Sequence, residues 1–301
     1  MVRPPIIERW FEQAARSPRT IVLADGHDPR ALEAAERLRA EGLVTPILLD
    51  DPADQRTPAV EAAAEALDKP VDLDDPLAVA VLLVATGEAD GCVAGASRPT
   101  ADVIRAGLSV LGTAPGVSAV SSSFVMVLAD GRPLVYGDCG VLPEPDAEQL
   151  AAVARSCADT HRQLCQGQPR VAMLSFGTRG SAEHPRVDKV RAATELARLA
   201  EPGLAVDGEL QFDAAVVESV AASKAPDSDV AGRANVLIFP DLDSGNIGYK
   251  ITERLARAKA IGPLLQGLGG VLHDLSRGCS VDDIVTVAVI ASLQSAARSS
   301  T

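Results

Sequence analysis

The chain has 301 residues, of which 47% are hydrophobic and only 3% aromatic, so aliphatic side chains must fill any large core. Its formal net charge of −13 leaves no sequence-wide basic field, which argues against a nucleic-acid-binding protein. The length suggests two domains or one large α/β unit.

The cysteines and histidines give no sign of a metal or disulfide site. The five cysteines contain no C-x-x-C pair, and the four histidines lie far apart in the sequence. We therefore expect reduced thiols, no disulfide framework and no zinc. The N-terminus lacks an apolar signal segment, and no apolar run reaches about 18 residues without a charge or a helix breaker. These features predict a soluble, cytoplasmic protein.

The N-terminal part of the chain alternates between helical and strand-like patterns. Apolar residues on one face predict a helix over 6–15, and a buried strand follows at 20–24. Pro29 suits the first turn of a helix over 30–41, and the next strand is expected at 46–49. This β-α-β unit predicts parallel strands joined by a right-handed crossover.

A second, acidic part of the chain is harder to assign. Residues 50–76 contain four prolines and predict loops around a short helix at 59–67. Residues 77–86 are almost uniformly apolar, so periodicity favours neither a helix nor a strand. A strand is expected at 90–95, and it leads into the start of a helix at 97–102.

The remainder repeats this alternation. Strands are expected at 117–129, 134–136, 171–175, 204–208 and 235–240, and helices at 146–165, 185–199, 213–224, 247–259 and 284–297. The alternation predicts an α/β fold with mainly parallel sheets and helices on both faces. A hinge is expected at 112–116, which gives a first α/β domain from 1–112 plus 271–301 and a second from 113–270.

Three loops share one layout, in which a small or glycine-rich turn follows a strand and opens a helix. They span 95–102, 175–181 and 241–246. Loops of this kind line the ligand crevice of open α/β sheets, and their polar side chains predict an anion site built from several strands. No G-x-G-x-x-G follows the first strand and no G-x-x-x-x-G-K-[ST] occurs, which argues against a dinucleotide site or a P-loop.

The polar stretch from Asp274 to Asp283 precedes an apolar helix, at a place where backbone N–H groups and the helix dipole favour anions. Ser280 is a good N-cap, and Asp283 follows it at the capping-box spacing. A cap of this kind is worth about 1 kcal/mol. From this stretch alone, a structural role for Asp283 is favoured over a catalytic one.

A series of short blocks, densest over 170–290, carries a family resemblance. The blocks are Asp207–Ala215, Lys224-Ala225-Pro226, Val230–Val236, Phe239–Leu242, Gly245-Asn246, Tyr249-Lys250, Gly262-Pro263, Gln266-Gly267 and Asp274–Gly278. Over nearly its whole length the chain resembles the phosphate acetyl/butyryl transferase family. The resemblance implies reversible transfer of an acetyl group between acetyl phosphate and coenzyme A (CoA), with CoA as a substrate and with neither a cofactor nor a metal. It also implies a homodimer and an active-site cleft between the two α/β domains.

The resemblance also implies roles for individual residues. Carried over by motif, Asp283 accepts the proton of the CoA thiol, and Ser276 hydrogen-bonds near the thiol or the developing oxyanion. Arg277 would stabilise charge in the transition state, and Arg105 matches a second family arginine near the CoA and phosphoryl site. The substrate-binding candidates are Arg98, Thr178, Arg179, Ser181, Lys224, Gly245 and Asn246.

The chemistry imposes one condition on these roles. The thiolate is the nucleophile, and moving a proton from an ordinary thiol to an ordinary aspartate is uphill by roughly 6 kcal/mol. We therefore expect either burial of the carboxyl group or cations that favour the thiolate. This predicts that Arg277 points at the substrate and that Asp283 lies against the apolar helix.

Two departures from the family pattern keep alternatives open. Residues 70–88 are short and acidic, where the family carries an Arg-Lys-rich stretch that supplies an arginine for CoA. Ser97-Arg98-Pro99 replaces the family's His-Ser/Thr pair. Either Arg98 replaces the arginine that the 70–88 segment lacks, or CoA binding is weak or altered. The alternatives are a propionyl or butyryl transferase, a CoA- or acyl-phosphate-binding homologue with weak or no turnover, and a hydroxy-acid dehydrogenase. The last predicts nucleotide binding that the loops do not support.

Overall fold

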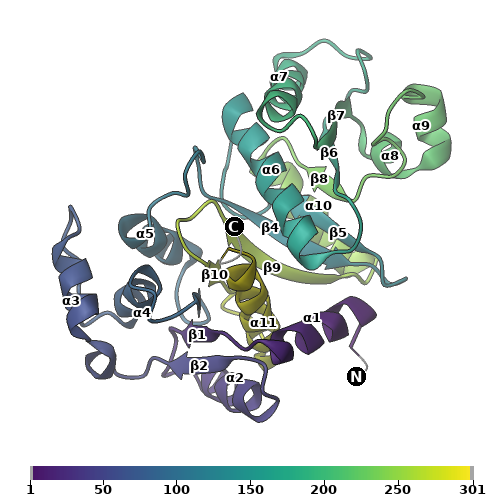
Figure 1. Cartoon of the computed structure of the whole chain (residues 1–301). Helices are drawn as coiled ribbons and strands as arrows, with labels where there is room; N and C mark the ends of the chain where they lie inside the picture. The colour runs from purple at the N-terminus through teal and green to yellow at the C-terminus, as the bar shows by residue number, and fades with distance from the viewer. Residues whose placement is uncertain (1–2, 299–301) are drawn as a thin grey trace. The chain divides into compact units, whose positions relative to one another are not determined.

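The computed structural model describes residues 3–298 and divides the chain into two compact α/β units (Figure 1). The first unit comprises Met1–Gly116 and Ile261–Thr301, and the second comprises Val117–Ala260. The strand β9 (Lys259–Gln266) carries the chain across the boundary between the units.

The first unit alternates helices and short strands. Its elements are α1 (Pro5–Arg16), β1 (Thr20–Leu23), α2 (Pro29–Ala40), β2 (Thr45–Leu48), a 3-10 helix η1 (Pro52–Gln55), α3 (Pro58–Glu65), α4 (Pro76–Ala85), β3 (Gly91–Ala94), α5 (Thr100–Val110), β10 (Leu272–Asp274) and α11 (Val281–Arg298). The helices and strands expected up to residue 67 are confirmed within a few residues. The segment that periodicity left open is the helix α4, and its residues Leu77–Leu83 are buried on every side.

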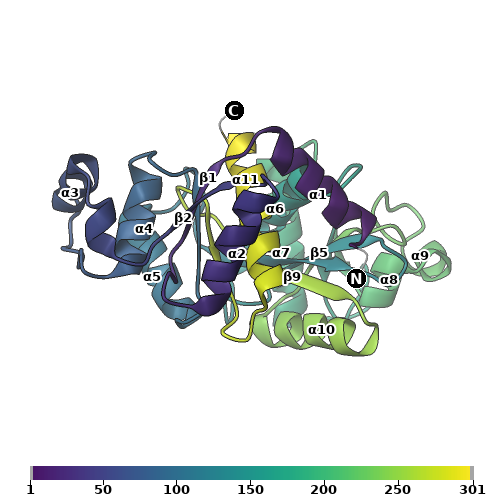
Figure 2. The same cartoon turned by 90° about the horizontal axis from the view of Figure 1, so that it is seen from below.

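The sheet of the first unit is parallel, with the strand order β10-β3-β1-β2. Val22 pairs with Ile47 and with Cys92, which confirms the predicted β-α-β unit. Figure 2 shows α2 and α11 on one side of these strands and α4 on the other. The N-terminal helix α1 packs on α11. Buried aliphatic side chains fill the space between these layers, and Trp10 is fully buried there.

The second unit holds the remaining elements. They are β4 (Ser121–Val127), β5 (Pro133–Gly137), α6 (Ala147–Leu164), β6 (Arg170–Leu174), α7 (Pro185–Ala200), β7 (Ala205–Leu210), α8 (Phe212–Val216), α9 (Glu218–Lys224), β8 (Val236–Ile238) and α10 (Leu242–Leu255). The strands β7-β6-β8-β5 are parallel neighbours, whereas β4 pairs antiparallel with β5. Figure 2 shows α6 and α10 on opposite sides of β5. Together the units give one parallel and one mixed sheet, which confirms the predicted α/β class.

Two predictions about individual elements were wrong, and two strands were missed. The helix expected over 213–224 is two short helices, because Val217 adopts an extended conformation between them. The helix expected from 247 begins at Leu242, since Asp241 caps it by accepting from the Ser244 N–H at 2.9 Å. The strands β9 and β10 were not expected, because β9 contains the Gly262-Pro263 pair and β10 has only three residues. None of the helices of residues 3–298 is both long and apolar enough to cross a membrane.

Candidate active site

The loop that joins β10 to α11 carries Ser276 and Arg277, and Asp283 follows in the first turn of α11. Leu275 is buried, and the chain then exposes Ser276, Arg277 and Gly278 before Cys279 turns inward. The turn closes on Ser276, whose carbonyl accepts from the Cys279 N–H at 2.8 Å and whose Oγ accepts from the Gly278 N–H at 3.2 Å. Within residues 3–298 the Arg277 side chain makes no hydrogen bond or ion pair, so its guanidinium is available to a ligand.

Asp283 lies in the first turn of α11, and the predicted capping box is present. Its Oδ2 accepts from both the N–H and the Oγ of Ser280 at 2.8 Å, and the Asp283 N–H donates back to the Ser280 Oγ at 3.2 Å. The side chain is half-buried. In the part of the chain that the structure describes, no hydrogen bond ends on Oδ1. One carboxylate oxygen therefore holds the helix start, while the other can accept a proton.

Arg30 was not among the residues predicted from the sequence, and its guanidinium holds this loop in place. Its Nη1 donates to the carbonyls of Arg277 at 2.9 Å and Cys279 at 2.8 Å, and its Nη2 donates to the Ala96 carbonyl at 2.8 Å. The carboxylate of Asp28, the N-cap of α2, accepts from Nε of the same guanidinium at 2.9 Å and from Nη2 at 2.6 Å. The hydrogen bond from Arg30 lowers the pKa of the Asp28 carboxyl. The signal in the sequence was Asp28-Pro29-Arg30, which reads only as a helix start.

The two arginines of the 97–105 segment differ in their surroundings. Arg105 is 70% exposed on α5 and forms an i,i+3 ion pair with Asp102 at 2.7 Å. Arg98 is half-buried, and its two terminal nitrogens contact Asp75 at 3.2 Å and 2.5 Å. Asp75 also caps α4, within the short acidic segment 70–88. The charge of Arg98 is therefore partly neutralised, whereas Arg105 is presented to solvent.

A buried carboxyl group lies directly before the Ser276 loop. Asp274 is fully buried, and its Oδ2 accepts from the Thr100 Oγ1 at 2.5 Å. Burial raises the pKa of the Asp274 carboxyl to about 6, against the lowering effect of the Thr100 hydrogen bond. Asp25, whose carboxylate accepts from the Ala96 N–H at 3.0 Å and the Ser97 N–H at 3.2 Å, raises it further.

In the second unit, three of the predicted substrate-binding residues form one hydrogen-bonded group with Gln211. The Thr178 N–H donates to the Ser181 Oγ at 2.8 Å, and the Gln211 N–H donates to the Thr178 Oγ1 at 2.9 Å. Lys224 donates to the Gln211 Oε1 at 2.9 Å and pairs with Asp213 at 3.1 Å. Arg179 follows Thr178 with a positive φ of 45°. The structure therefore brings these residues together at the carboxyl ends of β6 and β7.

Arg179 is nevertheless held by the protein itself. Its guanidinium pairs with the buried carboxylate of Asp207, which also receives Arg198 at 3.0 Å and the hydroxyl of Ser228. A carboxylate that is buried and paired with two arginines keeps both guanidiniums in place. This arrangement shows a structural use for Arg179 beside the predicted one.

Gly245 and Asn246 lie apart from that group, in the first turns of α10. The Asn246 side chain donates to the Cys139 carbonyl at 3.1 Å and accepts from Lys250 at 2.7 Å. A Cβ at position 245 would lie 2.2 Å from the Asp138 carbonyl oxygen, so only glycine fits there. The buried Asp138 carboxylate accepts backbone N–H groups from Ser122, Gly140 and Leu142, among others, and so shapes the loop on which α10 rests.

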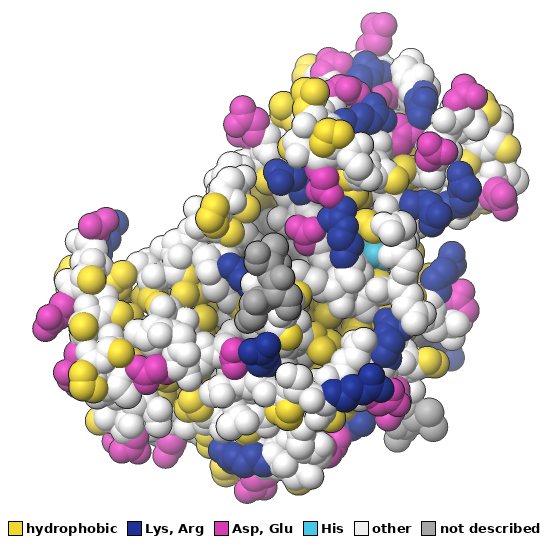
Figure 3. Space-filling view, viewed as in Figure 1, with side chains coloured by type: hydrophobic (Ala, Val, Ile, Leu, Met, Phe, Trp, Pro, Cys, Tyr) yellow, Lys and Arg dark blue, Asp and Glu magenta, His cyan; other side chains and the backbone are white. Residues whose placement is uncertain are grey.

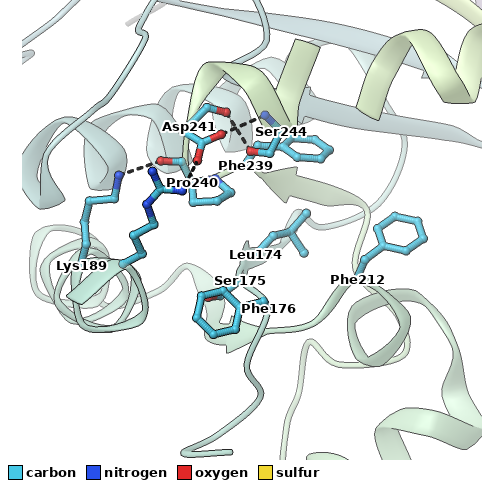
Figure 4. A pocket seen from close by; sticks show the side chains of 10 residues that line it. Leu174, Ser175, Phe176, Lys189, Phe212, Phe239, Pro240, Asp241 and Ser244 are labelled. Atoms are coloured by element: carbon cyan, nitrogen blue, oxygen red, sulfur yellow. Dashed lines mark hydrogen bonds and ion pairs between the residues drawn. The ribbon is translucent and has the colours of Figure 1, made fainter. Parts of the chain in front are cut away.

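A cavity of about 360 Å³ opens in the second unit where β6 and β8 end (Figure 4). Phe176, Phe212 and Phe239 give it apolar walls, and Arg186 and Lys189 contribute the cations. Lys189 donates to the Pro240 carbonyl at 2.8 Å. None of the predicted substrate-binding residues lines this cavity, but Phe212, the neighbour of Gln211 in the sequence, does.

The surface shows a mixture of charges, and the described residues form no metal site. On the described residues of the face drawn in Figure 3, acidic side chains are interspersed among the basic ones. In residues 3–298 no group of three or more His, Cys, Asp or Glu side chains could hold a metal ion. What the first unit offers is the unpaired guanidinium of Arg277, the exposed guanidinium of Arg105 that pairs with Asp102, a hydroxyl and a carboxylate, a set suited to binding phosphate and moving a proton.

Comparison with known proteins places these features in a family context. The model of the family described as phosphate acetyl/butaryl transferase matches residues 5–68 and 59–292. A phosphate acetyltransferase from Paracoccus denitrificans is 45% identical over 313 residues, which cover 96% of this chain and 98% of that protein. One from Clostridium acetobutylicum is 43% identical, with 96% and 98% covered.

Solved structures give the same answer. A phosphotransacetylase from Streptococcus pyogenes superposes with a TM-score of 0.92 at 40% identity, covering 99% of this chain and all of that one. A branched-chain phosphotransacylase from Enterococcus faecalis has a TM-score of 0.69 at 20% identity, with 92% and 99% covered, and shares the fold.

Proposed function

Because the chain belongs to the phosphate acetyl/butaryl transferase family, we propose that it is a phosphate acetyltransferase that moves an acetyl group reversibly between acetyl phosphate and CoA. The products in one direction are acetyl-CoA and inorganic phosphate. The observation that carries this proposal is the 45% identity with a phosphate acetyltransferase over 96% of the chain. The exposed Ser276-Arg277 turn, with Asp283 at the start of α11, gives that activity a place on the chain.

The proposed chemistry begins with the thiol of CoA. Its S–H bond breaks, and the proton passes to Oδ1 of Asp283, the oxygen that Ser280 leaves free. The sulfur forms a bond to the carbonyl carbon of acetyl phosphate, and collapse of the tetrahedral intermediate breaks the carbon–oxygen bond to phosphate. Phosphate leaves with that electron pair.

The cations stabilise the charge that develops in this step. Arg277, which has no partner among the described residues, is placed to bind the oxyanion or the phosphoryl oxygens, and Ser276 adds a hydroxyl donor beside it. Arg105 provides a second guanidinium. Donors aimed at a developing oxyanion are each worth about 10²- to 10³-fold in rate, and a positioned base about 10²- to 10⁴-fold. The substrate-binding roles of Arg98, Thr178, Arg179, Ser181, Lys224, Gly245 and Asn246 stay predictions.

The test is formation of acetyl-CoA from acetyl phosphate and CoA by the purified protein. We expect Asp283→Asn to lower kcat by about 10²- to 10⁴-fold, because the amide cannot accept the thiol proton. Asp282→Asn is the matched control, since Asp282 is the neighbouring acid on α11 and pairs with Arg37 instead. Wild-type activity that Asp283→Asn leaves intact would remove Asp283 from the mechanism.

Acyl preference is tested separately. Three relatives of 43–45% identity are phosphate acetyltransferases, which favours acetyl phosphate over propionyl or butyryl phosphate. A panel of the three acyl phosphates at equal concentration should give the highest kcat/KM with acetyl phosphate. CoA binding by calorimetry without turnover of any of them would favour a binding homologue instead.

The proposal includes a homodimer, and α10 offers a surface for it. Ile247, Ile251 and Leu255 are 57%, 52% and 80% exposed and lie four residues apart, so they form one apolar stripe. Such stripes mark interaction sites, and a two-fold axis near Ile251 would bring Ile247 of one copy against Leu255 of the other. We expect Ile251→Glu to give a monomer in size-exclusion chromatography with light scattering. Leu199→Glu, a change at an equally exposed leucine on α7, should not.

The cytoplasm is the proposed location. All five cysteines are free thiols, which suits a reducing compartment. Fractionation of expressing cells, followed by the acetyl-CoA assay, tests this location.

A further inference from the structure

Thr100 and Asp274 join two segments of the first unit that carry the proposed catalytic residues. Thr100 is the first residue of α5, and Asp274 is the last residue of β10. The Thr100 Oγ1 donates to the Asp274 Oδ2 at 2.5 Å. Asp274 is fully buried, so it cannot touch a substrate, and the proposed mechanism assigns it no step.

Each end of this bond leads directly to the site. On the α5 side, Asp102 in the same first turn pairs with Arg105 at 2.7 Å. On the β10 side, Ser276 and Arg277 follow Asp274 by two and three residues. A shift of Thr100 relative to Asp274 would therefore move Arg105 relative to Ser276 and Arg277.

A second contact registers the same helix on the same strand. A Cβ at Gly107 would lie 2.8 Å from Leu272 Cδ2, so α5 lies close against the side chains of β10 there. α5 also packs on α4. The hydrogen bond at Thr100, two turns from Gly107, adds a polar contact that fixes the first turn of α5 on β10.

The Asp274 side chain is closely enclosed. A Cβ at Gly95 would lie 2.2 Å from the Asp274 Oδ1 and 2.9 Å from the Leu275 N, which shows how closely the β3 loop covers the carboxyl group. A side chain enclosed in this way transmits position well, because it cannot change rotamer without moving its neighbours.

We propose that Thr100 and Asp274 are positioning residues, which hold Arg105 at a fixed place relative to Ser276 and Arg277 for the transfer reaction. The proposal deepens the proposed function and rests on it. The rival explanation is that the bond only stabilises the fold of the first unit.

The first test compares three variants in the acetyl-CoA assay. Thr100→Val keeps the shape of the side chain and removes the donor, whereas Thr100→Ser keeps the hydroxyl. Thr86→Val makes the same change at the C-cap of α4, where the Thr86 Oγ1 bonds the Leu83 carbonyl at 3.2 Å. We expect kcat/KM to fall by about ten- to a hundred-fold in Thr100→Val and by less than about three-fold in the other two.

A double-mutant cycle separates positioning from stability. If Thr100 acts through Arg105, Thr100→Val should lower the activity of an Arg105→Ala enzyme by less than about three-fold, because the residue it positions is gone. Thr86→Val should have the same small effect in both backgrounds. Equal losses from Thr100→Val with and without Arg105 would overturn the proposal.

Hydrogen exchange measures, without any substrate, how firmly Thr100 fixes the start of α5. The backbone amides of residues 101–106 should exchange faster in Thr100→Val than in Thr100→Ser or Thr86→Val. If the wild type made no acetyl-CoA, the proposed function would fail, and this measurement would still decide whether Thr100 fixes α5. Unchanged exchange in Thr100→Val would refute the positioning role whatever the activity.

Discussion

Arg30 donates a hydrogen bond of 2.8 Å to the backbone carbonyl of Cys279, although 249 positions of the sequence separate them. The same nitrogen reaches the carbonyl of Arg277, and Asp28 prevents the guanidinium from turning away. The conformation of the proposed catalytic turn is therefore set by the first turn of α2.

Replacing Arg30 should damage activity through this turn. In Arg30→Met the carbonyls of Arg277 and Cys279 lose their donor, and leaving the part-buried Cys279 carbonyl unpaired costs about 1–3 kcal/mol unless the turn opens to water. We expect kcat/KM to fall by at least about ten-fold. Arg39→Met is the matched control, since the Arg39 side chain on the same helix donates to the Pro46 carbonyl at 3.1 Å, away from the turn. Equal activities of the two variants would show that the turn holds its shape without Arg30.

The pair formed by Arg98 and Asp75 bears on CoA affinity. Asp75→Asn keeps the cap of α4, because asparagine is also a good N-cap, and it removes the charge opposite Arg98. If Arg98 faces CoA, the KM for CoA should fall by about 1.5- to 5-fold at low ionic strength, the range expected of a partly exposed pair. Asp90→Asn makes the same change beside Arg19 and should not alter KM. A KM that Asp75→Asn leaves unchanged would exclude Arg98 from the CoA site.

Much of the fold was predictable because local signals and burial agree. Pro29 behind Asp28 marks the start of α2, and the β-branched strands of the first unit pair as expected. A fully buried helix has no polar face and therefore no hydrophobic periodicity, so the sequence could not show that 77–86 is a helix. The start of α10 was predicted too late because Gly245 was taken as part of a loop. This glycine instead allows the close approach of the Asp138 carbonyl.

The candidate site could be predicted only for residues that lie close together in the sequence. Ser276, Arg277 and Asp283 lie close together in the sequence, and the capping box followed from the spacing of Ser280 and Asp283. Arg30 and Thr100 act over long sequence separations, through a backbone carbonyl and a buried carboxyl group that no local pattern reveals. Motif resemblance therefore selected exposed residues as candidates and did not select Arg30 or Thr100.

Gly95 should be irreplaceable for a reason specific to Asp274. Gly95→Ala would strain a residue at φ +99° and also push a methyl group into the Asp274 carboxylate, so we expect the free energy of unfolding to fall by more than about 2 kcal/mol. Gly87→Ala is the control, because Gly87 also has a positive φ, of +77°, but faces open space. It should cost only about 1 kcal/mol. Urea unfolding followed by the fluorescence of Trp10, the single tryptophan, reports on the first unit.

Asp274 should also make the first unit less stable as pH rises. Burial raises the pKa of its carboxyl from 3.8 to about 6, so the folded chain binds this proton more tightly than the unfolded chain does. Its stabilising contribution is therefore complete below pH 3.8 and is lost as the pH rises through about 6. The difference between the two values corresponds to roughly 3 kcal/mol.

Asp274→Asn removes this titration while keeping the size of the side chain and a partner for Thr100. Relative to the wild type, the variant's free energy of unfolding should therefore rise by up to about 3 kcal/mol between pH 4 and pH 7.5. Asp25 is the charged neighbour that contributes to the raised pKa, and its own hydrogen bonds to Ala96 and Ser97 stay in place in the variant. Urea titrations of Trp10 fluorescence at several pH values measure the difference, with Asp90→Asn as a partly exposed control. Curves for Asp274→Asn and wild type that stay parallel over this range would mean that Asp274 carries its charge in the folded protein without penalty.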